Sequence, residues 1–106
     1  MIEQFEKMLA QGQDNALLRF SLGTAYLKQD ELSNAIEHLQ AAVQQDPNYS
    51  AAWKQLGNAW KAQGQVNEAL NAYEQGIQAA QQQGDTQAAK EMQVFARRLR
   101  TTIETD

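Results

Sequence analysis

The chain of 106 residues contains no cysteine, one histidine and one proline. Without cysteine, a disulfide framework, a thiol nucleophile and a thiolate zinc site are all excluded. A single histidine with no histidine or cysteine companions does not make a transition-metal site. A domain this small must therefore be stabilised by the packing of its own elements, and we expect no metal.

Long apolar runs and excess basic charge are also missing. No segment approaches the roughly 18 apolar residues that a membrane-spanning helix needs. The start of the chain, MIEQFEKMLAQG, lacks the basic region and continuous apolar stretch of a secretory signal. The formal net charge of −4 disfavours nucleic acid as an electrostatic partner. We therefore expect a cytoplasmic protein with no membrane insertion and no nucleic-acid partner.

The sequence offers no convergent set of catalytic groups. Its six glycines fall at turns or helix packing points, and none belongs to a phosphate-binding loop. We expect His38 to face solvent on a helix, and the paired acids to lie at turns and outer helix faces. The prediction is a protein that is not an enzyme, has no catalytic residues and takes no cofactor.

What the chain does contain is a repeated apolar pattern. Four residues share one face of a helix because they lie three, four and seven positions apart, and we expect this face to be buried. They are Trp53, Leu56, Gly57 and Trp60. A glycine inside a helix costs about 1 kcal/mol relative to alanine, so a second helix is expected to pack closely there. Truncating Trp60 to alanine is expected to cost roughly 3–5 kcal/mol.

The same pattern recurs earlier, at Leu22, Gly23 and Tyr26, and later, at Met92, Phe95, Ala96 and Leu99, so the chain is an internal repeat. Turn residues divide it into a half repeat at 2–11, repeat one at 16–49, repeat two at 50–83 and a closing helix at 86–103. The last recurrence comes later than the repeat length predicts. The glutamine-rich run Gln78–Asp85 absorbs the difference, which predicts a lengthened helix end and loop. We expect about six helices in a single domain.

The pattern resembles the tetratricopeptide repeat, a helix-turn-helix of about 34 residues with the motif W-x-x-L-G-x-x-Y followed by alanine, an aromatic residue and proline. Repeat two supplies Trp53, Leu56, Gly57, Trp60, Ala69 and Tyr73, and repeat one supplies Leu22, Gly23, Tyr26, Ala35, Leu39, Ala42 and Pro47. Two positions depart from the pattern, since Arg19 stands where tryptophan is usual and Gln81 where a proline is expected. The resemblance implies an all-α, right-handed α-solenoid of antiparallel helix pairs.

In this family, the first helices of successive repeats line a concave groove that binds an extended peptide of a partner protein. The resemblance assigns eleven residues to that groove. They are Leu17, Phe20, Thr24, Leu27, Lys28, Lys54, Gln55, Asn58, Lys61, Lys90 and Arg97. With Arg100, six of the nine basic residues are expected in the groove, and no acidic residue is expected there. Like charges in a concave site attract anionic partners, so we expect an acidic or C-terminal segment to bind, with an apolar contact on Phe20 and Leu27.

Some family members clamp a terminal carboxylate with a lysine and an asparagine one turn apart, and Lys54 with Asn58 match that pair. Val94 stands where the next helix would supply another asparagine, so a complete clamp is not expected.

Two alternatives stay open. The first is a structural module that forms a homodimer through the N-terminal helix or a terminal repeat face, since Ile2, Phe5 and Leu9 could pair with a second copy. A monomer or a weak homodimer is therefore expected. The second is a minor enzymatic or nucleic-acid role of the arginine cluster at positions 97–100.

Overall fold

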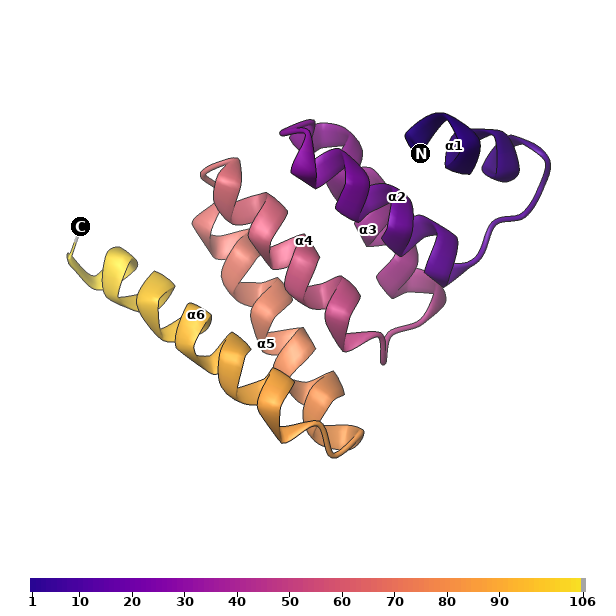
Figure 1. Cartoon of the computed structure of the whole chain (residues 1–106). Coiled ribbons are helices and arrows are strands. Elements are labelled where there is room, and N and C mark those ends of the chain that lie inside the picture. The colour runs from indigo at the N-terminus through magenta and orange to yellow at the C-terminus, as the bar shows by residue number, and fades with distance from the viewer. Residues whose placement is uncertain (106) are drawn as a thin grey trace.

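The computed structural model describes residues 1–105, and this part of the chain folds into six α-helices (Figure 1). They are α1 (Ile2–Ala10), α2 (Ala16–Lys28), α3 (Leu32–Gln45), α4 (Ser50–Ala62), α5 (Val66–Gln82) and α6 (Thr86–Thr105). The prediction of an all-α fold with six helices is confirmed. Helices α2 and α3 form one antiparallel pair, α4 and α5 form the next, and α6 packs on α5.

The turns follow from residues that accept a left-handed backbone. Asp30, between α2 and α3, has φ of 61°, and Gly64 has φ of 82° at the equivalent turn between α4 and α5. Aspartate and glycine both tolerate this region, which is strained for most other residues. Helix α2 begins where the side chain of Asn15 accepts a hydrogen bond of 2.8 Å from the backbone N–H of Leu18.

The glutamine-rich run is helical as far as Gln82, so α5 reaches 17 residues. The predicted lengthening of this helix is confirmed, but the predicted lengthening of the loop is wrong, because residues 83–85 that separate α5 from α6 are no more numerous than residues 63–65 that separate α4 from α5. The molecule measures 46 × 31 × 18 Å, as expected for helix pairs that stack side by side instead of surrounding one centre.

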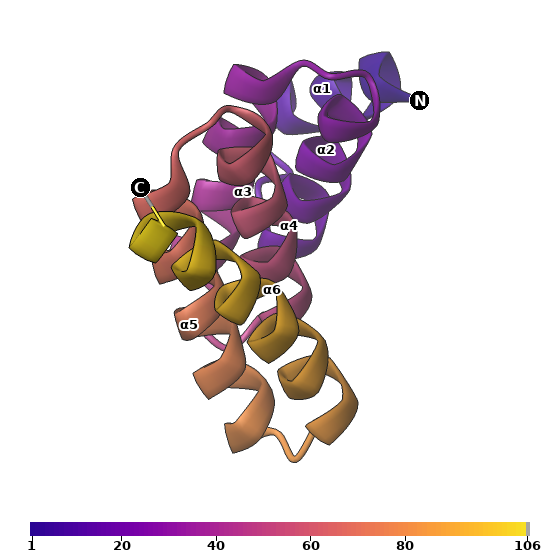
Figure 2. The ribbon, with the colours of Figure 1, turned by 90° about the vertical axis from the view of Figure 1, so that its left-hand side faces the viewer.

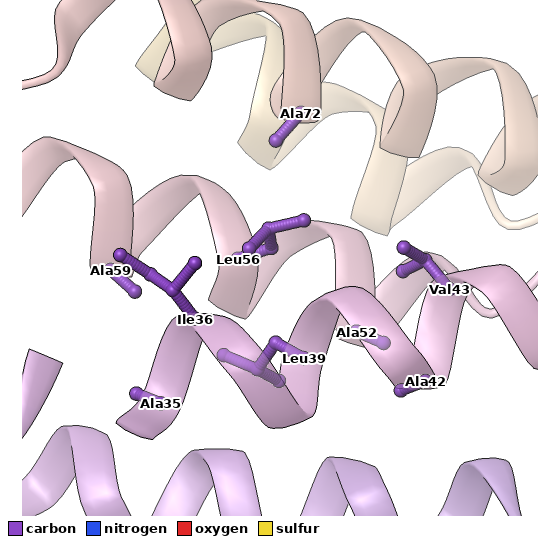
Figure 3. Packing of buried hydrophobic residues seen from close by; sticks show 9 residues of the cluster. All are labelled: Ala35, Ile36, Leu39, Ala42, Val43, Ala52, Leu56, Ala59 and Ala72. Carbon is purple, nitrogen blue, oxygen red and sulfur yellow. The ribbon is translucent and has the colours of Figure 1, made fainter. Parts of the chain in front are cut away.

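The main core lies between α3 and α4 and includes one residue of α5 (Figure 3). Its buried members are Ala35, Ile36, Leu39, Ala42, Val43, Ala52, Leu56, Ala59 and Ala72. A second cluster joins α5 to α6 around Tyr73 and Met92. The core uses many alanines, so the helices approach one another closely.

Two helix glycines mark the closest approaches within the pairs. A Cβ atom on Gly23 would lie 2.4 Å from Cγ of Leu39, and one on Gly57 would lie 2.4 Å from Cε1 of Tyr73. Neither position has room for a side chain. The expectation that another helix packs against Gly57 is confirmed.

The tryptophan face is only partly buried, which corrects the sequence prediction. Leu56 and Gly57 are buried, but Trp53 and Trp60 are half-buried and line a cleft of about 330 Å³ bounded by α3 and α5. The indole Nε1–H of Trp53 donates a hydrogen bond of 2.8 Å to the carbonyl of Pro47. Among the described residues, Tyr73 is the largest fully buried side chain.

Candidate functional site

Helices α2, α4 and α6 form one row of the molecule, with α3 and α5 on the other side (Figure 2). The backbone of α4 closely approaches those of α2 and α6, whereas α3 and α5 make no such approach within residues 1–105. The row of α2, α4 and α6 is thus the more tightly spaced. We use the name first-helix face for the eleven predicted groove residues, all of which lie on these three helices.

Most of the cations assigned to the first-helix face are available to a ligand. Lys28, Lys61, Lys90 and Arg97 are exposed, and none forms an ion pair with another described residue. These four side chains come from all three helices of the row. Their charge is not neutralised by the protein itself.

Lys54 differs, and it corrects the prediction that no acid lies on this face. Its Nζ atom is 3.0 Å from Oε1 of Glu91, which joins α4 to α6. The Lys54 side chain is 33% exposed. A ligand carboxylate at this position would compete with Glu91.

Arg100 is also placed differently from the prediction. Its Nη2 atom donates a hydrogen bond of 2.9 Å to Oε2 of Glu74 on α5. Since α5 belongs to the opposite row, Arg100 is directed away from the first-helix face.

Asn58 is held in a fixed orientation on the first-helix face. Its Oδ1 atom accepts a hydrogen bond of 2.6 Å from the hydroxyl of Tyr73, and its Nδ2–H donates to Oε1 of Gln55 at 3.0 Å. Burial raises the pKa of Tyr73 to about 12, so the hydroxyl remains a donor at neutral pH. The amide of Asn58 keeps one N–H for a ligand.

The apolar residues assigned to the face lie on α2 and differ in accessibility. Leu17 is 65% exposed. Phe20 and Leu27 are half-buried and pack against the main core, and the ring of Phe20 lies 4.9 Å from that of Tyr49. Leu17 and the exposed part of Phe20 are therefore available for an apolar contact.

A buried polar cluster around His38 was missed by the sequence analysis. His38 was expected to face solvent, but it is only 6% exposed and its ring stacks on Tyr26 at 5.6 Å. Arg19 donates from Nη1 to Nδ1 of His38 at 3.0 Å. Arg19 also binds both carboxylate oxygens of Asp14, at 2.8 and 2.9 Å.

This geometry fixes the state of the His38 ring. A guanidinium has no acceptor, so Nδ1 of His38 must accept and the proton of the neutral ring resides on Nε2. That Nε2 lies 3.4 Å from Oε1 of Glu6 on α1. The hydrogen bonds from Arg19 and then Gln45 hold the pKa of Asp14 at about 2, so Asp14 stays charged. The sequence signal was Arg19 itself, a charged residue at a tryptophan position that needs a polar partner.

The buried His38 makes stability depend on pH. Burial lowers its pKa below the usual 6.5, and the charge of Arg19 lowers it further, although Glu6, Glu37 and Asp14 oppose this. Between the folded and the unfolded pKa, the unfolded chain binds a proton at His38 and the folded protein does not. We expect the free energy of unfolding to fall as pH decreases from about 6.5 towards the folded pKa. Denaturant unfolding measured between about pH 7 and pH 5 tests this.

His38→Gln is the matched variant for that experiment, because glutamine can still accept from Arg19 but does not titrate. It should flatten the pH dependence over this range. A variant with the same slope as the parent protein would show that other groups cause the effect.

Residues 1–105 contain neither a cluster of metal-ligating side chains nor a membrane-spanning helix. No group of three or more histidine, cysteine, aspartate or glutamate residues in this part could hold a metal ion. None of its helices combines the length and apolarity needed to cross a bilayer.

The fold and its glycine contacts define a class of helical repeat protein, and comparison with known families agrees. Tetratricopeptide repeat families match residues 28–92 and residues 2–50. The chain belongs to the tetratricopeptide repeat family. Its domains are generally protein–protein interaction modules, and the family is typically non-catalytic.

Particular relatives cover nearly the whole chain. The TPR repeat-containing protein PA0015 of Pseudomonas aeruginosa is 57% identical over 93% of this chain and 94% of its own length. The solution structure of protein BPP2914 from Bordetella parapertussis matches with a TM-score of 0.82 and 49% identity, over 96% of this chain and 89% of that one. The Sgt2 TPR domain from Aspergillus fumigatus matches with a TM-score of 0.81 and 28% identity, over 97% and 66%.

Proposed function

We propose that the first-helix face binds an extended acidic segment of a partner protein, or its acidic C-terminus, without carrying out chemistry. The observation that carries this proposal is the set of four exposed cations without acidic partners among the described residues, in a protein of net charge −4. Basic charge gathered on one face of an acidic protein attracts an anionic ligand and excludes a basic one. An affinity in the micromolar range, about −8 kcal/mol, is expected.

The residues divide into three roles. Lys28, Lys61, Lys90 and Arg97 neutralise ligand carboxylates. Asn58 offers its remaining N–H in an orientation that Tyr73 has already fixed, which reduces the entropy lost on binding. Leu17 and Phe20 contact an apolar residue of the ligand.

The binding test is a titration with two peptides of equal length, one acidic and one with the acids changed to their amides. The double variant with Lys61→Glu and Lys90→Glu should lower the affinity for the acidic peptide by about tenfold. Exposed ion pairs contribute about 0.2–1 kcal/mol each, and reversing the charge adds repulsion. Lys7→Glu, at an exposed site on α1, is the net-charge control and is compared with Lys61→Glu alone, because these two single variants change the net charge by the same amount. The proposal is wrong if the amide peptide binds equally well or if Lys7→Glu has the same effect.

Glu91 provides a second, opposite test. Since Glu91 forms an ion pair with Lys54, Glu91→Gln should free that lysine and increase the affinity for the acidic peptide. The increase should disappear when Lys54→Gln is added. Tightening that persists in the double variant would exclude Lys54 from the binding surface.

A further inference from the structure

Three residues hold the same position in successive second helices, one repeat length apart, namely Phe5, Leu39 and Tyr73. Leu39 packs on Gly23 of α2, and Tyr73 packs on Gly57 of α4, so each sits against a glycine of the first helix in its own pair. Phe5 lies on α1, and α1 has no first helix within residues 1–105 (Figure 1). The contact that buries the other two is absent for Phe5.

The missing contact leaves a cleft of about 440 Å³ between α1 and α2, which we call the end slot. Its walls include Ile2, Phe5, Phe20, Thr24, Ala25 and Lys28. Phe5 is only half-buried, whereas Leu39 and Tyr73 are almost completely buried. The end slot therefore presents apolar surface where the rest of the repeat packs a helix.

Two polar groups of α2 also belong to the end slot. The hydroxyl of Thr24 is buried and has no hydrogen-bond partner among the described residues. Lys28 is exposed and carries a positive charge that no described residue pairs. An occupant with an acidic residue near Lys28 would be complementary.

We propose that the end slot docks an amphipathic helix of a partner protein, with a glycine against Phe5 and an acidic residue near Lys28. A helix is favoured because first helices that carry glycine fill the equivalent positions beside Leu39 and Tyr73. Glycine is required because Leu39 and Tyr73 leave no room for a Cβ atom at that approach. The terminal helix of a second copy is a poor occupant, because its exposed Arg97 and Arg98 would repel Lys28.

The probe is a helix-stapled peptide with the sequence of residues 50–62 carrying Lys54→Glu and Lys61→Glu, which is a first helix with acidic charge. It is titrated into the ¹⁵N-labelled protein. We expect saturable chemical-shift changes confined to α1 and α2. The same peptide with Gly57→Leu should bind about tenfold more weakly, because its backbone can no longer approach Phe5.

A matched pair of protein variants locates the site. Ala25→Trp fills the end slot and should lower affinity for the peptide by about tenfold, whereas Ala62→Trp, at the exposed end of α4, should leave it within about twofold. Helix content measured by circular dichroism verifies that both variants fold. The acidic extended peptide used for the first-helix face is titrated in parallel, so the two proposals can fail independently.

Three results would overturn the proposal. The first is absence of saturable binding, and the second is shift changes centred on α4 and α6. The third is a concentration-dependent dimer in sedimentation that Ala25→Trp abolishes, which would assign the end slot to a second copy of the chain.

Discussion

Tyr73→Ala is expected to lower the free energy of unfolding by about 3–5 kcal/mol. The side chain is 1% exposed, it fills the space against Gly57, and its ring lies 5.5 Å from that of Phe95. Alanine would leave a cavity among α4, α5 and α6 and remove the hydrogen bond to Asn58. Because small domains are stable by only about 5–15 kcal/mol, the variant should be largely unfolded at moderate temperature.

Two variants calibrate this prediction in denaturant unfolding monitored by circular dichroism. Tyr73→Phe keeps the ring and loses the hydroxyl, so it should cost only about 0.5–1.5 kcal/mol. Trp60→Ala should cost less than Tyr73→Ala, because Trp60 is half-buried and part of its ring already contacts water. The reverse order for Trp60 and Tyr73 would mean that the tryptophan face is the true centre of the core.

Gly23→Ala should destabilise the protein by about 1–3 kcal/mol through overpacking. The new Cβ atom would lie 2.4 Å from Cγ of Leu39 and 3.2 Å from the carbonyl oxygen of Ala35. Leu39 is completely buried and cannot move aside. The clash outweighs the advantage of about 1 kcal/mol that alanine has over glycine inside a helix.

A double-mutant cycle with Leu39→Ala separates these two effects. With Leu39 truncated, the clash with its side chain disappears and the 3.2 Å contact with the carbonyl oxygen of Ala35 remains, so Gly23→Ala should become close to neutral. Thermal unfolding of the four proteins gives the coupling free energy. An equal cost in both backgrounds would show that Gly23 is needed for a reason other than its contact with Leu39.

The sequence predicted the close packing at Gly57 but not the polar cluster at His38. Gly57 interrupts an apolar helix face, and such an interruption is informative within a single helix. His38 lies beside buried Leu39, and one helix alone does not reveal whether its neighbours cover the ring. Arg19 reaches it from α2, and Glu6 approaches from α1. The three groups are brought together only when the helices pack.

The first-helix face was likewise predictable only in part. The repeat register assigned Lys28, Lys61 and Lys90 to the groove, and the structure has all three exposed. It did not anticipate that Glu91 would turn towards Lys54, or that Arg100 would turn towards Glu74. Both contacts join α6 to another helix, so they depend on how α6 packs against α4 and α5 and not on the pattern within one helix.

The sequence by itself determined the six helices, their turns and the small residues at close approach, because apolar periodicity and turn chemistry act over a few neighbouring residues. Only the tertiary structure decided which cations remain unpaired, how deeply Trp60 and His38 are buried, and that a slot remains beside Phe5. These properties depend on contacts between separate helices, such as that of Lys54 with Glu91, which are 37 residues apart. A small rotation of one helix exchanges such partners without changing its own pattern.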